Sequence, residues 1–516
     1  MKKHTTVILL LIVAALVLSA NIWGYSIYLL DEAKNAECAR EMLETGNWVV
    51  PTFNYELRSD KPPLHYYFMA LAYSVFGVNE FAARFFSMVF GLLTLLSVYY
   101  FTCQHLGQKV AKYSTIVLLS SIGFIVQFHL AVPDPYLVFF VTASIFSFYR
   151  GYKKERPGWL YFSYTSMGLA VLTKGPVGLV LPLLSIIVFL VFKKQLNFGA
   201  ASKLKAWPGG LMFLVITIPW YWLVYQQTDG AWFQSFFVEH NVERFLSPKE
   251  GHGGLFLITP LYLLIMTLPL GLFIFPAIKS IWNERGNDLT LLSLILIVVV
   301  VIVFSISATK LPNYVSPALP FVAIVIGNYL AERHQVLLAD KIIFALFLIM
   351  SLTPVSSIIL DVDLESISLN KFWPLYLITL GGVLGVVFCW KNNLDKALWS
   401  VASTFVLAIV LLFYTAIPVM DQQNPVQQSM NDIESNNNIA AFHIFNPSFS
   451  FYLKRPVHVF ENIDDLQQFI HTQDSVIVLT RRSVLPELAP LNLDTLKIRK
   501  DLFESTSTVV LRKRYQ

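Results

Sequence analysis

Long apolar runs with few charged residues dominate the pattern of hydrophobic and polar positions along the chain. Thirteen of these runs approach the roughly 20 residues that a helix needs to cross the hydrocarbon core of a bilayer. They lie at 8–28, 80–102, 112–131, 135–150, 159–173, 176–192, 208–226, 255–277, 289–308, 315–331, 342–360, 373–389 and 397–418. The pattern predicts a polytopic α-helical membrane protein with about 13 transmembrane helices.

The first apolar run decides how the N-terminus is interpreted. The segment from Thr5 to Leu30 contains no Asp, Glu, Lys or Arg, although its middle part, ending at Ala20, also resembles the end of a signal peptide. Because the run continues past Ala20 to a length that can span a bilayer, a first transmembrane helix is favoured over a cleaved signal peptide.

Lysine and arginine residues concentrate in every second loop between the runs. One set of loops contains Lys2, Lys3, Lys109, Lys112, Arg150, Lys153, Lys154, Arg156, Lys193, Lys194, Lys203, Lys205, Lys279, Arg285, Arg333, Lys341, Lys391 and Lys396. The short loops of the other set contain at most one such residue each. The positive-inside rule therefore predicts a cytoplasmic N-terminus and a C-terminus on the outer face of the membrane, here called the periplasmic face.

Two long loops lie on the predicted periplasmic face, at 31–79 and 227–254. The first loop contains two amphipathic segments that we expect to form helices along the membrane interface. Gly46 is expected to end the first helix, and Pro62-Pro63 to start the second.

The composition becomes polar after Pro418. Short β-type runs (AAFHIF, PVHVF, SVIVLT and STVVLRK) surround a helical segment, NIDDLQQFIHT. We therefore expect a membrane domain over 1–418 and a small periplasmic α/β domain over 419–516.

Composition narrows the classes of function. Of the 516 residues, 55% are hydrophobic and only 14% are charged, whereas soluble proteins carry about a quarter charged residues. A net charge of +5 without a dense basic stripe argues against nucleic acid as a partner. The three cysteines lack metal-site spacing, and the chain contains no phosphate-binding glycine loop, so no nucleotide cofactor is expected.

Three acids at the predicted periplasmic ends of the apolar runs are candidate site residues. Asp31 and Glu32 follow the first run, and Asp134 stands in a short turn between two others. Each could also cap or complement a helix N-terminus, and this interpretation suffices for Glu32. Ionisable groups at the ends of membrane spans are costly unless they pair or line a cavity, so Asp31 and Asp134 remain site candidates.

Three lysines at the same face each precede a helix-breaking residue: Lys61 in SDKPP, Lys174 in LTKGP and Lys310 in ATKLPNY. Together they could form a rim that binds a phosphate group. The alternatives are snorkelling of at least one lysine to the interface, and a surface ion pair between Asp60 and Lys61 worth under about 1 kcal/mol.

Six motifs in order resemble a known family: DEAKNAECAREMLETGNWVVP, SDKPPLHYY, VPDPYLVFF, LTKGPVGLVLP, VEHNVERF and KLPNYVSPALP. They are similar to the polyprenyl-phosphate-dependent glycosyltransferases of the GT-C fold, in the bacterial branch that includes the lipid A aminoarabinose transferase. The protein O-mannosyltransferases are more distant relatives. The resemblance covers about residues 20–330.

The resemblance implies inverting transfer of a sugar from an undecaprenyl-phosphate-type carrier to lipid A, another glycan or a protein. It assigns Asp31 as the general base or the group that orients the acceptor, and Asp134 as a second acid on the acceptor side. It places Lys61 at the donor phosphate as it leaves, with Tyr314 nearby and Lys310 beside it.

The remaining candidates are expected to support these groups. Donor-phosphate candidates are Lys61, Lys174, Arg244, Lys310 and Tyr314, and acceptor-side or structural candidates are Glu32, Arg40, Glu239 and His240. The resemblance also implies that Asp60 and His252 could hold a divalent metal ion (Zn, Mg or Mn), although a lone loop histidine is more often solvated. The alternatives to an enzyme are a lipid or glycolipid transporter and a scaffold protein.

Overall fold

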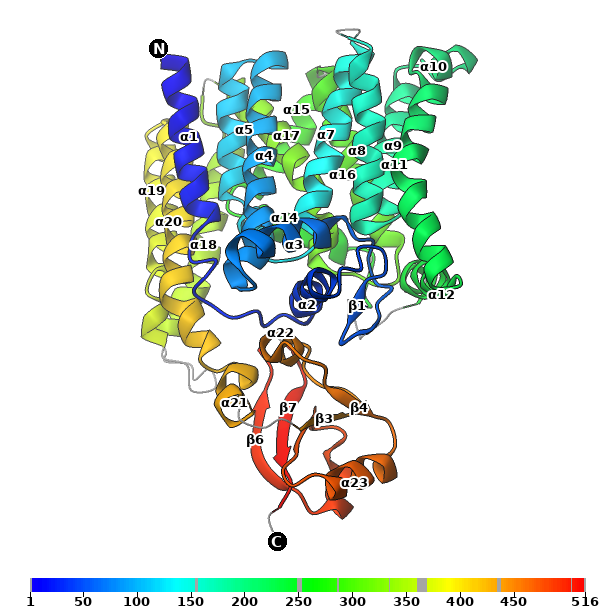
Figure 1. Ribbon diagram of the computed structural model, residues 1–516. Helices are drawn as coiled ribbons and strands as arrows, with labels where there is room; N and C mark the ends of the chain where they lie inside the picture. The colour runs from blue at the N-terminus through cyan, green and yellow to red at the C-terminus, as the bar shows by residue number, and fades with distance from the viewer. Residues whose placement is uncertain are drawn as a thin grey trace.

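The structure is a computed structural model that describes residues 2–153, 156–247, 253–284, 287–333, 335–359, 369–433, 438–502 and 504–514. Helices stand side by side in a large bundle, and a small domain with a β-sheet lies beyond one end of it (Figure 1). The bundle contains α1 (Lys2–Leu18), α4 (Glu80–His105), α5 (Gln108–Ser120), α6 (Ile122–Gln127), α7 (Asp134–Tyr152), α8 (Gly158–Lys174), α9 (Val177–Phe192), α10 (Phe198–Lys203), α11 (Ala206–Gln227), α14 (Ile258–Met266), α15 (Ile274–Glu284), α16 (Asp288–Ile306), α17 (Leu319–Ala331), α18 (Leu338–Ile359), α19 (Leu375–Trp390) and α20 (Leu394–Asp421).

Every predicted apolar run coincides with a helix or a broken pair of helices. Six helical segments within the described residues are long and apolar enough to cross a membrane, and a pair bent by 119°, Ile258–Met266 and Gly271–Ile281, could make a seventh. The protein is therefore a membrane protein with multiple apolar helices, while the count of 13 spans stays a prediction.

The first helix is shorter than the sequence pattern predicts. α1 ends at Leu18, and the next residues form turns that run across α4. Arg84 of α4 donates hydrogen bonds to the backbone carbonyls of Ile22, Tyr25 and Ser26 at 2.9–3.0 Å. The expectation of a helix to residue 28 was wrong because a buried arginine, distant in sequence, satisfies the carbonyls of a non-helical segment.

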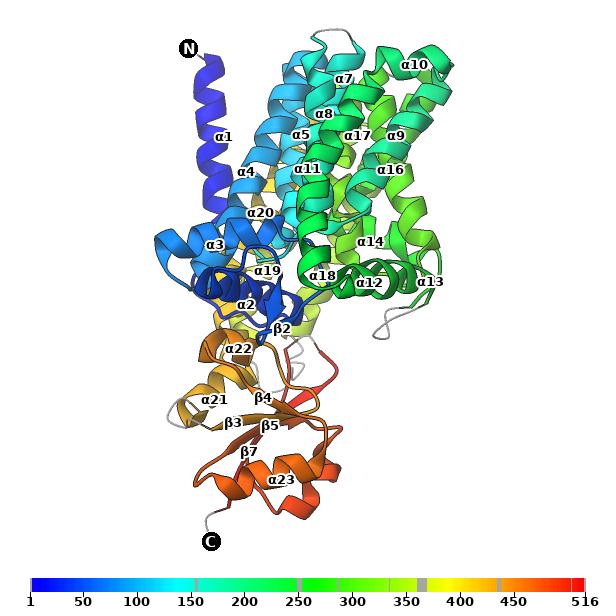
Figure 2. The same cartoon turned by 45° about the vertical axis from the view of Figure 1, so that its right-hand side comes forward.

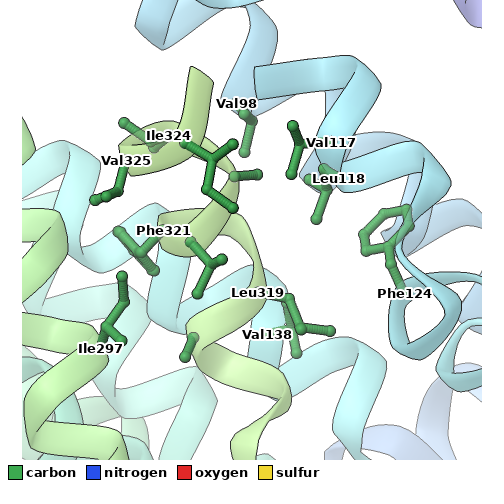
Figure 3. Close-up of a cluster of buried hydrophobic side chains, with 14 of the residues drawn as sticks. Val98, Val117, Leu118, Phe124, Val138, Ile297, Leu319, Phe321, Ile324 and Val325 are labelled. Atoms are coloured by element: carbon green, nitrogen blue, oxygen red, sulfur yellow. The ribbon is translucent and has the colours of Figure 1, made fainter. Parts of the chain in front are cut away.

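The apolar core of the bundle is centred on α17. Its side chains, among them Phe321, Ile324 and Val325, pack between residues of α4, α5, α7 and α16 (Figure 3). Where α17 meets α5, a Cβ atom added at Gly327 would lie only 2.6 Å from the backbone nitrogen of Ser114. This close approach explains a glycine in an otherwise bulky helix.

Two helices lie between the bundle and the C-terminal domain (Figure 2). These are α2 (Leu30–Thr45) and α3 (Leu64–Phe76), which the sequence predicted. As expected, α2 ends at Gly46, whose φ is +67°, and α3 begins directly after Pro63. A short hairpin of β1 (Thr52–Phe53) and β2 (Glu56–Leu57) follows α2.

The C-terminal domain contains a five-stranded sheet in the order β4-β3-β5-β7-β6. The strands are β3 (Ile439–Phe442), β4 (His458–Phe460), β5 (Ile477–Arg481), β6 (Asp494–Lys500) and β7 (Ser507–Arg512), and its helices are α21 (Pro425–Ile433), α22 (Ser448–Leu453) and α23 (Ile463–Thr472). β3 pairs in parallel with β4 and β5, and β7 is antiparallel to β5 and β6. The four predicted strands and α23 are confirmed, whereas β6 was not predicted.

The C-terminal domain is docked on α2 through α22. Phe451 of α22 belongs to the same buried apolar cluster as residues of α2 and α3. The hydroxyl of Tyr452 accepts a hydrogen bond from the backbone nitrogen of Ile27 at 2.8 Å and donates one to Glu80 at 2.9 Å. Asn54 makes two further hydrogen bonds with the backbone of Val457. The domain therefore contacts the segments just before and just after α2.

Candidate functional site

A buried ion pair fixes the beginning of α2. Both side chains of Glu32 and Arg84 are fully buried, and the guanidinium donates to the carboxylate at 2.8 and 3.1 Å. The backbone nitrogen of Ala131, just before α7, donates to the same carboxylate at 2.9 Å. Glu32 therefore lies in the first turn of α2, as the helix-terminus interpretation expected, and it also joins α2 to α4 and to the segment before α7.

Asp31 faces a different environment from its neighbour. Its side chain is exposed to solvent, although many protein atoms lie around the carboxylate. It makes no cap, because α2 begins at Leu30 without a side-chain cap hydrogen bond. Burial opposes ionisation of Asp31, but the charges of Lys61 and Arg58 outweigh it and lower its pKa.

Lys61 lies among the charged groups that the sequence singled out. It is half-buried in the turn before α3. Burial lowers its pKa, the charges of Asp31 and Asp60 oppose this effect, and the positive charges of Lys174 and Arg244 reinforce it. Residues from four separate segments thus act electrostatically on one ammonium group.

The second acid, Asp134, belongs to a network beside this lysine. Asp134 is the first residue of α7 and is 2% exposed. Its carboxylate accepts hydrogen bonds from Lys174 Nζ at 2.6 Å and from Asn313 Nδ2 at 3.3 Å. The same Nζ lies 5.5 Å from the ring centroid of Tyr314, and Arg244 hydrogen-bonds the tyrosine side chain. The helix-cap interpretation of Asp134 was therefore wrong, because α7 has no side-chain cap bond.

These residues stand at the ends of their elements. Lys174 is the last residue of α8, where Gly175 with φ +76° ends the helix. Tyr314 lies in the short helix η3 (Pro312–Ala318), which precedes α17, and Arg244 begins α13 (Arg244–Leu246). Element ends meeting at one face of the bundle bring together groups that are far apart in sequence, as the sequence analysis expected.

Asp60 is held by an arginine and a histidine. Its carboxylate lies 3.3 Å from Arg58 Nε and 3.0 Å from His240 Nε2. Burial opposes its ionisation, but Arg58, Lys61 and His240 lower its pKa well below the usual range. His240 belongs to η1 (Ser235–Glu243), so this contact ties the long loop after α11 to the turn that carries Lys61.

Glu239 continues the same connection. Ser59 donates to Ser235 at 2.8 Å, and Ser235 donates to Glu239 at 2.6 Å. Together with the bond between His240 and Asp60, this chain of hydrogen bonds supports a structural interpretation of both loop residues.

Of the two residues predicted to bind a metal ion, only Asp60 lies within the described residues. His252 lies outside the described residues. Within the described part of the chain, no group of three or more His, Cys, Asp or Glu side chains could hold a metal ion. Asp60 is already paired with Arg58 and His240, so the described residues alone do not fit a metal site.

Two predicted residues have other contacts. Lys310 is buried and donates to the backbone carbonyl of Ser307 at 2.7 Å. Arg40 donates to both carboxylate oxygens of Glu37 at 2.7 and 2.8 Å and also pairs with Glu44. These contacts favour a structural interpretation for Arg40.

Sequence reasoning missed Arg58, a buried cation whose charge lowers the pKa of both Asp31 and Asp60. Its guanidinium donates to Asn35 of α2 at 3.0 Å, and its backbone carbonyl accepts from Trp232 Nε1 at 3.0 Å. A signal was available, since Arg58 stands two residues before Asp60 in ELRSDKPP. Arg84 was missed because nothing local shows that a charge within an apolar run has a buried partner.

The comparisons with known proteins agree with this geometry. A family model described as dolichyl-phosphate-mannose-protein mannosyltransferase matches residues 60–222. An uncharacterised protein of Aquifex aeolicus (strain VF5) is 31% identical over 313 residues, which cover 60% of this chain and 70% of that protein. The undecaprenyl phosphate-alpha-4-amino-4-deoxy-L-arabinose arabinosyl transferase of Edwardsiella ictaluri (strain 93-146) is 26% identical over 485 residues, covering 88% of this chain and 86% of the relative.

Among solved structures, ArnT from Cupriavidus metallidurans in the apo state superposes with a TM-score of 0.83 at 21% identity, covering 100% of this chain and 99% of that one. The same protein bound to undecaprenyl phosphate gives a TM-score of 0.79, with 99% and 98% coverage. The chain belongs to the polyprenyl-phosphate-dependent GT-C glycosyltransferases. The comparisons thus confirm the predicted family and enzyme class for this GT-C glycosyltransferase, and they do not favour a lipid transporter.

Proposed function

We propose that this GT-C glycosyltransferase moves a sugar, with inversion, from an undecaprenyl-phosphate-type carrier to an envelope acceptor at the periplasmic face of the inner membrane. The acceptor class is lipid A or lipopolysaccharide, another glycan, or a protein. The observation that carries the proposal is the solvent-reachable Asp31 carboxylate, whose pKa is lowered by Lys61 and Arg58 against the effect of burial. The names of the relatives support the carrier and the sugar-transfer chemistry.

In the proposed reaction, ionised Asp31 accepts the proton of an acceptor hydroxyl or amine. The acceptor atom then bonds to the anomeric carbon while the bond from that carbon to the phosphate oxygen breaks. The electron pair leaves with the polyprenyl phosphate, whose growing negative charge is stabilised by Lys61, Lys174 and Arg244. Asp134 holds the Lys174 ammonium in place through the 2.6 Å contact.

The decisive experiment is transfer by the purified protein in lipid vesicles. Undecaprenyl-phosphate-linked sugars and extracted envelope lipids are supplied, and the products are identified by mass. Asp31→Asn should abolish transfer while expression and membrane insertion remain intact. Asp288→Asn is the matched control, because that aspartate pairs with Lys153 and Lys193 instead. Full activity of Asp31→Asn would refute the assignment.

A divalent ion is a separate proposal. We propose Asp60 as its carboxylate ligand, with His252, and such an ion would have to share Asp60 with Arg58 and His240. Dialysis against a chelator should then lower transfer, and Zn²⁺, Mg²⁺ or Mn²⁺ should restore it. Unchanged transfer after complete removal of divalent metals would contradict this proposal without affecting the role of Asp31.

A further inference from the structure

An apolar cavity lies at the end of the bundle that is remote from α2. Its volume is about 210 Å³, and it is bounded by α7, α8, α9, the α9–α11 connection and α10. Its floor is formed by buried Phe148, Leu160 and Met167. In Figures 1 and 2, α10 stands at the end of the bundle where the chain begins, whereas α2 and α3 lie at the other end.

The rim of this cavity is open to the surroundings of the bundle. Leu183, Ile187 and Leu196 line it and are 38%, 37% and 52% exposed. Apolar cavities of about 150 Å³ stay dry and take up small hydrocarbons. In a membrane protein the available hydrocarbon is a lipid chain, so this cavity suits part of an acyl chain that enters from the side.

The segment that closes the cavity is strongly basic. Residues 193–205 contain four lysines and no acidic residue. Lys193 is paired with Asp288 at 2.7 Å, whereas the side chains of Lys194, Lys203 and Lys205 are exposed. The same segment also contributes apolar residues to the lining of the cavity, namely Leu196, Ala200 and Leu204. Residues 193–205 therefore supply both positive charge and part of the lining of the apolar cavity.

We propose that this cavity binds an anionic glycerophospholipid, with one acyl chain inside and the phosphate against Lys194, Lys203 and Lys205. Each lysine near a membrane surface favours anionic lipid. Trp207, which is 85% exposed two residues later, suits the interface where a headgroup would lie. A volume of about 210 Å³ suits a short length of chain rather than the much longer tail of a polyprenyl carrier. The proposal is independent of the transfer reaction at the other end.

The test is native mass spectrometry of the full-length protein in detergent, titrated with phosphatidylglycerol or with phosphatidylcholine carrying the same chains. The protein should bind phosphatidylglycerol at least tenfold more tightly, and Lys194→Gln/Lys203→Gln/Lys205→Gln should remove this preference. Lys109→Gln/Lys391→Gln/Lys396→Gln is the control, since these lysines are also exposed but lie in other loops. Equal loss in both triple variants would overturn the site, because charge alone would then explain the binding.

A cavity-filling variant tests the position of the acyl chain. Ala201 lines the cavity with an exposed side chain, so Ala201→Phe can fill the space without disturbing the core. It should weaken binding of phosphatidylglycerol about tenfold while sugar transfer stays unchanged. Unaltered lipid binding in Ala201→Phe would refute the proposal. Displacement of phosphatidylglycerol by equimolar undecaprenyl phosphate would also overturn it, in favour of the carrier.

Discussion

Removing Arg84 alone should destabilise the protein more than removing Arg84 together with the charge of Glu32. In the native protein the Glu32 carboxylate is fully buried and accepts hydrogen bonds from Arg84 and from the backbone of Ala131. In Arg84→Met the guanidinium donors are lost and the Ala131 donor remains. A buried charge that loses its partner typically costs about 3–5 kcal/mol.

Arg84→Met also leaves three backbone carbonyls, those of Ile22, Tyr25 and Ser26, without their donor. Each unsatisfied buried acceptor costs about 1–3 kcal/mol. The loss of stability from these carbonyls is the same in Arg84→Met and in Arg84→Met/Glu32→Gln. The buried carboxylate without its arginine exists only in the single variant. The double variant should therefore be the more stable of the two, although it carries an additional substitution.

Thermal unfolding in detergent micelles, followed by tryptophan fluorescence, measures this order of stability. The native protein, both single variants and the double variant form a complete cycle. Lys153→Met is the matched control, because its pairing with Asp288 is exposed and should contribute less than about 1 kcal/mol. A double variant that unfolds below Arg84→Met, or whose loss equals the sum of the two single losses, would refute the reasoning.

Four further predictions concern the site and the docked domain. In the pH profile of kcat/KM, the acid limb should report protonation of the Asp31 carboxylate. Lys34→Met removes a positive charge that lowers the pKa of Asp31, so it should move this limb to higher pH. An unmoved limb would contradict the role of Asp31 as base. The alkaline limb should fall below the usual lysine range, because the pKa of Lys61 is lowered. Lys174→Met should reduce kcat/KM about ten- to hundredfold, the loss expected for one charge-assisted hydrogen bond, and native kinetics would exclude Lys174 from the site. Tyr452→Phe leaves the Ile27 nitrogen without its acceptor and should increase hydrogen exchange at the start of α2, measured against Tyr376→Phe, an exposed tyrosine.

The sequence predicted the helices best where local chemistry decides their limits. Gly46 ends α2 and Pro63 precedes α3 because each acts within one turn of the chain. β6 was missed because Lys497, Arg499 and Lys500 give an exposed edge strand a polar pattern that resembles a loop. Local pattern also extended α1 too far, since the donors that replace its helical hydrogen bonds come from Arg84.

The sequence could predict which residues belong to the candidate site, but only some of the contacts between them. Topology alone placed Asp31, Lys61, Asp134 and Lys174 at one face, because positive charges mark the other. It could not show that Asp134 pairs with Lys174, nor that Arg58 acts on Asp31, since both depend on the rotation of helices about their own axes. Pairings of this kind are set by packing over long sequence separations.

The different environments of Asp31 and Glu32 follow from helix geometry. Consecutive residues of an α-helix do not share a face, so a rotation that buries one side chain directs its neighbour elsewhere. The bonds from Glu32 to Arg84 and to the segment before α7 fix that rotation at the first turn of α2. Asp31 can turn away from Lys61 only if this buried ion pair breaks. The buried charge of Glu32 thus determines where the carboxylate that we propose as the base is presented.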